Sequence, residues 1–219
     1  MVPEWFTILN TIHSEFHGAR SDYIVAGIGS ADGAEVDRMF SYVDLGERAD
    51  YTHDIRRTLQ CIASCMNIFD KIAFFLRSYY HVEIGVRQVY FSGPRSIFTK
   101  VQSPTFPGVQ ENFAALRSMS RDLENSFFRR VQRYRDSITH RYVVVIKEPG
   151  VDPDAAVADD ASRILATDAR KLAKTGLLVA KAGIYYLTAL VTSHDWHLEK
   201  GRHIERRPGL PLGRPRADV

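Results

Sequence analysis

The strongest constraint on the fold of this chain is the spacing of apolar residues between Thr52 and Tyr80. The steps from one apolar position to the next alternate between four and three along the whole segment: Ile55, Leu59, Ile62, Met66, Phe69, Ala73, Leu76 and Tyr80. An α-helix has about 3.6 residues per turn, so this spacing puts all of these side chains on one face. The pattern predicts a long helix over 52–80 that packs along its entire length in a bundle.

Two more segments have the same helical spacing. A helix is predicted over 110–146, between Pro107-Gly108 and Pro149-Gly150, from a stripe whose steps are all three or four: Phe113, Leu116, Met119, Leu123, Phe127, Val131, Tyr134, Ile138, Tyr142 and Val145. Another is predicted over 154–193, and its second half is apolar nearly all round, which favours burial between neighbours. The predicted fold is therefore all-α, a bundle of long antiparallel helices.

The remaining segments are less regular. Residues 82–109 contain glycines and prolines among aromatic residues, which predicts one long ordered loop of the kind that often serves function. Residues 1–50 read as an annex of mixed short elements: a helix over 3–16, a strand or extended piece over 23–28 and a short helix over 35–43. The predicted division is an annex at 1–50, a helical domain at 51–196 and a basic, flexible tail at 197–219.

Charge is unevenly distributed along the chain. The formal net charge is +3, of which residues 200–219 carry +4 and residues 1–199 carry −1. A basic tail can contact nucleic acid, but its proline and glycine content favours a solubilising, disordered terminus. The near-neutral body gives no indication of a large RNA-binding groove, but charge can be concentrated locally.

Several classes of protein are disfavoured by what the sequence lacks. The longest apolar stretch, 177–192, is short for a membrane span and contains Lys181, and the N-terminus shows no secretory signal, so a cytoplasmic protein is expected. Cys61 and Cys65 lie one helical turn apart, which is typical of small core residues and not of a zinc or redox pair. His13 and His17 have no evident third ligand, so no metal site and no cofactor are expected.

One polar segment interrupts this apolar pattern. Residues 133–142 read RYRDSITHRY, and four polar residues there lie off the predicted apolar stripe: Arg135, Asp136, Thr139 and His140. On a helix Asp136 and His140 share a face, about 40° apart, whereas Arg135 and His140 are about 140° apart. An arginine side chain is long enough to reach the same groove. The alternative interpretation is a solvated helix face with surface ion pairs.

Arg135-x4-His140 resembles the R-x4–6-H motif of the HEPN superfamily of helical domains. With Tyr142 it is similar to the R-x4-H-x-Y form of HEPN toxins that are paired with MNT nucleotidyltransferase antitoxins. The segments around Asn67–Tyr80, Val89–Phe91 and Ile138–Tyr142 resemble the LA2681-like branch, over about residues 51–193. The first fifty residues and the tail lie outside this resemblance.

The resemblance implies a metal-independent endoribonuclease, a toxin or defence effector that acts on RNA as a homodimer. Arg135, His140 and Asp136 would be catalytic, because histidine transfers protons near neutral pH, arginine holds phosphate oxygens and aspartate orients the imidazole. Arg141 and Thr139 would contact substrate. Tyr142 would be a regulatory modification site for an MNT-type partner. The alternatives are a non-catalytic HEPN module that binds a partner protein or nucleotide, and a helical scaffold in which the motif is accidental.

Overall fold

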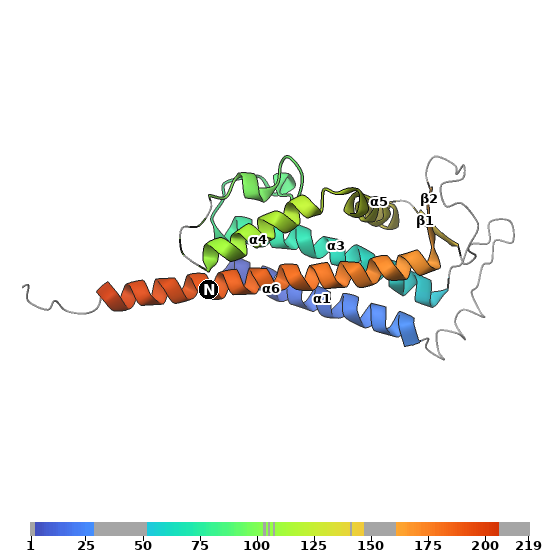
Figure 1. The fold of residues 1–219 in the computed structure, drawn as a ribbon, viewed down its shortest axis with the longest axis horizontal. Helices are drawn as coiled ribbons and strands as arrows, with labels where there is room; N and C mark the ends of the chain where they lie inside the picture. The colour runs from blue at the N-terminus through green and yellow to red at the C-terminus, as the bar shows by residue number, and fades with distance from the viewer. Residues whose placement is uncertain are drawn as a thin grey trace, which may run out of the picture.

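The computed structural model describes residues 3–28, 52–102, 104, 106, 108–140, 142–146 and 161–205. It is an elongated helical bundle (Figure 1). Its helices are α1 (Glu4–Ile28), α3 (His53–Tyr79), α4 (Val109–Asp122), α5 (Ser126–His140) and α6 (Ala166–Glu205), with short 3-10 turns at Val86–Gln88 and Ile97–Thr99. Two short strands, β1 (Tyr142–Ile146) and β2 (Ala161–Leu165), lie at one end. The predicted all-α fold is confirmed.

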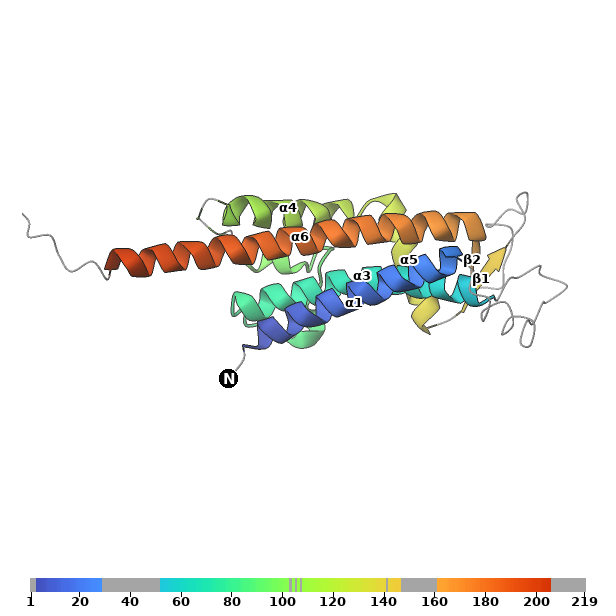
Figure 2. The ribbon, with the colours of Figure 1, turned by 90° about the horizontal axis from the view of Figure 1, so that it is seen from below.

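Helix α3 is the centre of the bundle. It packs against α1, α5 and α6, and α6 also packs against α1 and α4 (Figure 2). The apolar face of α3 is almost completely buried, with Phe69, Ile72, Phe75 and Leu76 each at 2% exposure or less. A helix buried from several sides explains why the apolar spacing of this segment was so regular.

Helices α3 and α6 approach closely because small residues meet at their crossing. A Cβ atom added at Gly176 would lie 3.2 Å from Cβ of Cys65, and one added at Gly183 would lie 3.2 Å from side-chain atoms of Ile72 and Phe69. Both Cys61 and Cys65 are free and buried, as expected for small core residues. A residue larger than glycine at position 176 or 183 would push α3 and α6 apart.

The single helix predicted over 110–146 is wrong. The chain leaves the helix after Asp122, turns at 123–125, resumes as α5 at Ser126 and ends in strand β1. Leu123 is buried in the turn, so both shorter helices direct their apolar residues to the same core and the three-and-four spacing continues across the break. Periodicity reports which side chains are buried and does not detect a local change in the backbone.

The strands replace helix at two predicted positions. Residues 142–146 read YVVVI, a β-branched run that favours strand, and they pair in parallel with β2 from Tyr142↔Ala161 to Ile146↔Leu165. The helix predicted over 154–193 begins only at Ala166. It then continues to Glu205, so residues 197–205 of the predicted flexible tail are helical. Residues 147–160 and 206–219 lie outside the described residues.

The N-terminal prediction is also partly wrong. Residues 4–28 form one continuous helix, although 23–28 alone favour an extended piece. Ile12, Ala19 and Ala26 are buried at intervals of seven, which places them on one face against the bundle. Helix α1 therefore shares the core with α3 and α6. The short helix predicted over 35–43 lies outside the described residues.

Two buried hydrogen bonds anchor the loop after α3. The hydroxyl groups of Ser96 and Ser120 donate to the backbone carbonyl of Phe91 at 2.6 and 2.7 Å. The Phe91 ring is buried and packs against Phe69 of α3 with ring centroids 5.1 Å apart. The predicted ordered loop is therefore fixed to both α3 and α4.

Two helices meet a simple length-and-hydropathy criterion for a membrane span, His53–Tyr79 and Ala166–His197. Buried core helices commonly pass the same test. Of the apolar window in α3, 67% is buried within the bundle, compared with 39% in α6. Composition and length alone are therefore weak evidence for insertion into a bilayer.

Candidate functional site

Helix α5 carries the polar motif and packs against α3. Its Arg135 side chain reaches across this contact to Asp70, with Nη1 3.2 Å from Oδ2. The same guanidinium contacts Asp136 on its own helix, with Nε 3.0 Å from Oδ1. One arginine is thus held by two carboxylates from different helices, a charge-assisted arrangement that fixes its orientation.

These residues line a pocket of about 340 Å³. Its walls come from α3, α5, the turn between α4 and α5, and the loop at 90–94: Asp70, Tyr90, Phe91, Ser92, Gly93, Pro94, Leu123, Glu124, Arg129, Gln132, Arg135 and Asp136. Most of this lining is polar, and it includes two cationic and three acidic side chains. The pocket is therefore suited to a polar, charged ligand.

The loop wall is held in place by hydrogen bonds to the motif side of the pocket. The backbone N–H of Gly93 donates to the Glu124 carboxylate at 2.9 Å, and Gly93 has the positive φ of 91° that glycine accommodates easily. Gln132 of α5 donates to the Ser92 hydroxyl at 3.4 Å. The ring of Tyr90 stays 44% exposed at the rim. An exposed aromatic side chain beside charged groups can stack on a planar ligand.

The electrostatics of the pocket centre on Asp70. Partial burial raises the pKa of its carboxyl group above the ordinary aspartate value, while the charge and hydrogen bond of Arg135 act in the opposite direction. The side chain of Asp70 is 42% exposed, so water still screens the pair. Arg135 is 27% exposed and is permanently charged, which makes it the principal cation of the pocket.

The structure brings together some, but not all, of the predicted site residues. Arg135 and Asp136 line the pocket, and His140 is the last residue of α5, so its backbone lies five residues further along the same helix. The side chains of Thr139 and His140 lie outside the described part of the chain, as does Arg141. Tyr142 was expected on the helix, but it is the first residue of β1.

Sequence reasoning did not assign a role to several pocket residues, of which Asp70 is the most important. Asp70 and Lys71 interrupt the apolar run of α3, and a charged pair inside a buried helix is a signal for specific partners. The structure separates the two: Asp70 faces α5, and Lys71 pairs with Glu15 of α1. Arg129 and Gln132 resembled ordinary polar positions of an amphipathic helix, so the sequence gave no comparable signal for them.

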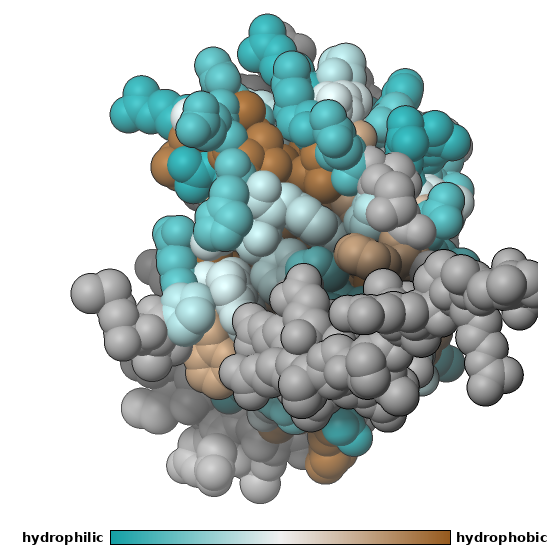
Figure 3. Space-filling model, turned by 90° about the vertical axis from the view of Figure 1, so that its left-hand side faces the viewer, coloured by the Kyte–Doolittle hydropathy of each residue, from teal (hydrophilic) through white to brown (hydrophobic). Residues whose placement is uncertain are grey.

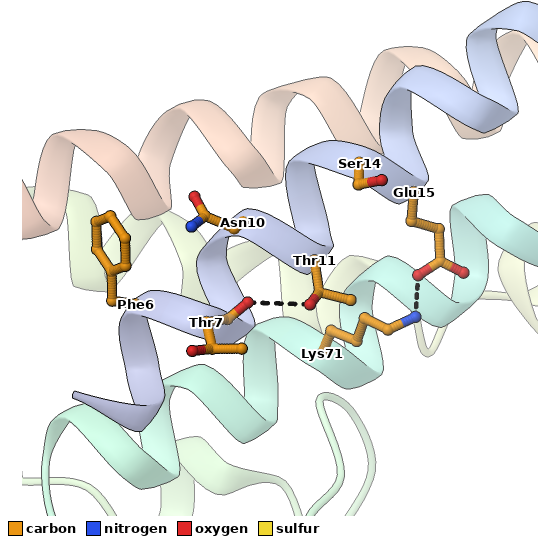
Figure 4. Close-up of a pocket in the computed structure, with 7 residues that line it drawn as sticks. All are labelled: Phe6, Thr7, Asn10, Thr11, Ser14, Glu15 and Lys71. Atoms are coloured by element: carbon orange, nitrogen blue, oxygen red, sulfur yellow. Dashed lines mark hydrogen bonds and ion pairs between the residues drawn. The ribbon is translucent and has the colours of Figure 1, made fainter. Parts of the chain in front are cut away.

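A second hollow lies on the other side of Lys71, between α1 and α3 (Figure 4). It is lined by hydroxyl and amide side chains of α1 and by the ion pair of Lys71 with Glu15: Phe6, Thr7, Asn10, Thr11, Ser14, Glu15 and Lys71. Thr11 donates to the carbonyl of Thr7 within its own helix. The one cation in this lining is already paired, so this hollow offers less to an anionic ligand than the Arg135 pocket.

At the end of α3, away from β1 and β2, aromatic residues surround His194. Its Nδ1 lies 2.5 Å from the Tyr79 hydroxyl, and Phe106 stacks on His197 with ring centroids 5.1 Å apart. Burial raises the pKa of the Tyr79 hydroxyl well above its ordinary value. Seen from this end, apolar surface is divided into separate areas by hydrophilic side chains (Figure 3). These contacts join α3 to α6, so we interpret the cluster as structural.

The residues that the structure describes contain no group of three or more His, Cys, Asp or Glu side chains that could hold a metal ion. His13 and His17, one turn apart on α1, are therefore not part of such a group.

A sequence model of the LA2681-like HEPN family matches residues 1–194. The chain belongs to this family. The match extends to the N-terminus, so the HEPN domain includes α1, which the resemblance over 51–193 had left out. No curated protein and no solved structure matches significantly.

Proposed function

We propose that this HEPN domain is a metal-independent endoribonuclease that acts at the Arg135 pocket. The observation that supports it best is the position of Arg135, a half-buried permanent cation at the wall of a polar pocket, on the helix that ends at His140. A cation that is pre-oriented in a partly dry site stabilises a developing phosphorane better than one in water.

The chemistry needs two proton transfers and one cation. The ribose 2′-oxygen attacks the adjacent phosphorus while a base removes the 2′-OH proton. The bond from phosphorus to the 5′-oxygen breaks as an acid protonates that oxygen, which leaves a 2′,3′-cyclic phosphate and a 5′-hydroxyl. His140 supplies base or acid, since imidazole titrates near neutral pH. Arg135 holds the non-bridging phosphate oxygens through its planar fork.

The two carboxylates around Arg135 have different parts in this proposal. Asp136 is more exposed, with 62% of its side chain in solvent, and lies one helical turn before His140. The substrate phosphate displaces the Asp136 carboxylate from Arg135, and that carboxylate then orients the imidazole of His140. Asp70 is a positioning residue that keeps the guanidinium directed into the pocket from α3. Arg141 and Thr139 follow in sequence and would contact the RNA beside the cleavage site.

The wider role that we propose is that of a toxin or defence-associated effector in the cytoplasm. In this role the protein is a homodimer, because a two-fold axis would bring two histidines to one cleft and thereby supply both acid and base. An MNT-type nucleotidyltransferase would restrain it by modification of Tyr142. The HEPN family membership and the exposed pocket support this role.

The second candidate is a non-catalytic HEPN module that binds a partner protein or a nucleotide. The ion pairs of Arg135 favour it, because an arginine neutralised by Asp70 and Asp136 can serve simply to join α5 to α3. In that case the pocket binds its ligand without cleavage.

The test is RNA cleavage in the presence of EDTA. Wild-type protein should convert cellular RNA to fragments with 2′,3′-cyclic phosphate ends. His140→Ala and Arg135→Ala should each lower the rate by about 10²–10⁴-fold, since each removes one catalytic contribution. Asp136→Asn should be milder, about tenfold or less, because the amide oxygen still accepts a hydrogen bond from the imidazole.

Arg133→Ala is the matched control, because Arg133 is an exposed cation of the same helix that does not line the pocket. It should cleave like wild type, and all variants should keep the helical circular dichroism spectrum. Cleavage by His140→Ala at the wild-type rate would show that the motif was misread. Intact RNA with wild-type protein would favour the non-catalytic module.

A further inference from the structure

The outer face of α6 concentrates positive charge far from the Arg135 motif in sequence. Between residues 169 and 194 this helix contains four basic residues and no acidic residue. All four are exposed: Arg170, Lys171, Lys174 and Lys181. Residues 1–199 together carry −1, so this excess is a property of one helix face and not of the whole body.

These cations form a line with an exposed aromatic ring. At 100° per residue, Arg170, Lys174, Lys181 and Tyr185 fall within a sector of about 60°, and they span about 22 Å along the helix axis. Tyr185 is 72% exposed, the largest value among the aromatic residues that the structure describes. We call these four residues the α6 ridge.

The ridge lies largely outside the packing of the bundle, although Arg170 contacts the end of α1. The opposite face of α6 supplies the core, where Leu187 and Leu190 are completely buried and Leu172 nearly so. The exposed side chains of Lys174, Lys181 and Tyr185 can therefore contact another molecule without disturbing the fold. Tyr185 in particular is exposed, and its ring meets that of its neighbour Tyr186 edge-on with ring centroids 6.5 Å apart.

Among the residues that the structure describes, few neutralise the charge of the ridge. Lys174 and Lys181 form no ion pair in the part of the chain that the structure describes, and Arg170 donates to the carbonyl of Ala26 at 3.4 Å. Lys171, just beside the ridge, is within 3.4 Å of Asp168, but both side chains are largely exposed and the pair is weak. Uncompensated cations in a row are complementary to a polyanion.

We propose that the α6 ridge binds the backbone of single-stranded RNA. Phosphates contact Lys174, Lys181 and Arg170, and one base stacks on Tyr185, the combination of a basic track and an aromatic platform that single-strand binding requires. The choice of RNA rests on the proposed function. The binding itself does not depend on cleavage, so it can be tested separately.

A membrane surface fits the ridge less well. A helix that lies in a bilayer interface turns a continuous apolar face to the lipid, whereas the apolar face of α6 is buried in the bundle. Among the described residues between Arg170 and Tyr185, Leu178 is the one large aliphatic side chain that is exposed, at 61%. Electrostatic attraction to a polyanion in water is therefore the simpler match.

The test measures binding of wild-type protein and of ridge variants to a fluorescent, fully 2′-O-methylated single-stranded oligonucleotide, which lacks the attacking 2′-OH and cannot be cleaved. Lys174→Gln combined with Lys181→Gln should weaken binding about tenfold at low salt. It should also lower the slope of log K against log salt by about 1.4, since each phosphate contact on a single strand contributes about 0.7. Tyr185→Ala should weaken binding about tenfold while the slope stays unchanged.

The matched control is Lys100→Gln combined with Arg117→Gln, which removes two exposed cations from outside the ridge and should bind like wild type. Equal loss in this control, or wild-type affinity in the ridge variants, would overturn the proposal. So would binding to phosphatidylserine vesicles with no binding to the oligonucleotide. If binding depends on the ridge but the protein leaves unmodified RNA uncut, the ridge proposal is supported and the nuclease proposal is rejected. If the ridge variants change neither binding nor cleavage of RNA, the nuclease proposal is supported and the ridge proposal is rejected.

Discussion

Arg135 of α5 and Asp70 of α3, separated by 65 positions in the chain, meet with Nη1 3.2 Å from Oδ2 at the wall of a polar pocket. This contact joins the motif helix to the central helix of the bundle. Asp70 would also compete with a phosphate for Arg135, because its carboxylate already contacts one nitrogen of the guanidinium. The behaviour of Asp70 variants is therefore informative about both stability and function.

Replacement of Asp70 by asparagine should separate substrate binding from turnover. The amide removes a negative charge from the pocket, so phosphate reaches Arg135 more easily and KM should fall several-fold. The guanidinium loses its charged anchor, a partly exposed contact worth about 1 kcal/mol or less, and kcat should fall up to about tenfold through misorientation. Steady-state cleavage of a short fluorogenic RNA measures both constants. A change in kcat with KM unaltered would contradict the competition described above.

The same variant should alter how stability depends on pH. Burial raises the pKa of Asp70, so the folded protein keeps this proton to a higher pH than the unfolded chain does. The stabilisation that this bound proton gives to the folded state is complete below the ordinary aspartate pKa. It is lost as pH rises through the raised pKa of Asp70 in the folded protein. Urea unfolding of Asp70→Asn between about pH 3 and 7 should therefore show the variant gaining stability relative to wild type as pH rises. If the variant instead lost stability relative to wild type as pH rises, the Arg135 pair would outweigh burial.

The protein should form a two-fold dimer with the segment 135–140 at or beside the interface, since one histidine cannot easily serve as both acid and base. Light scattering at tens of micromolar should give twice the 24.9 kDa monomer mass. Mixing wild type with an excess of His140→Ala should lower activity more than dilution predicts. A strict monomer, or loss in simple proportion, would argue that each chain acts alone.

Tyr142 is predicted to accept an AMP group from an MNT-type nucleotidyltransferase, because the added phosphate would repel RNA at the end of the motif helix. Tyr142 starts β1 and pairs with Ala161, so it does not belong to the helical apolar stripe in which the spacing had placed it. Mass spectrometry after co-expression with a neighbouring nucleotidyltransferase should find the modification, and Tyr142→Phe should lack it. An unmodified Tyr142 under these conditions would end this proposal.

Adjacent residues of the pocket loop should differ sharply in their effect on stability. Phe91→Ala should lower the free energy of unfolding by about 3–5 kcal/mol, because the ring is 2% exposed and packs against Phe69. Tyr90→Ala, at the exposed rim, should change it by about 0.5 kcal/mol or less. Denaturant unfolding of the two variants measures the contrast. Equal effects would show that the loop is not anchored through Phe91.

The apolar spacing alone was sufficient to predict the central helix almost residue by residue. The predicted range was 52–80, and α3 runs over His53–Tyr79 with its apolar residues in one continuous stripe. It was also sufficient for the all-helical class, whereas the ordered loop before α4 was predicted from its glycines, prolines and aromatic residues. These features are local or depend only on which side chains are buried, and burial is recorded in the sequence with a helical period.

Backbone breaks could not be predicted in the same way. The turn at 123–125 and the change to strand at Tyr142 keep the apolar side chains directed to the core, so the spacing continues while the backbone changes. Likewise, residues 23–28 favour an extended piece by composition, but packing of Ala26 against the bundle keeps them helical. Here tertiary contacts outweighed local preference.

The candidate site divides along the same line. Sequence determined the polar segment on α5, because Arg135 and Asp136 fall off the apolar stripe of their own helix. Only the tertiary structure decided that Asp70 is the partner of Arg135, that Lys71 faces the other way, and that the loop at Tyr90 closes the pocket. A helical period tells which residues of one element share a face. Which faces of different elements meet depends on how the helices pack, and a single sequence does not encode that packing in any local pattern.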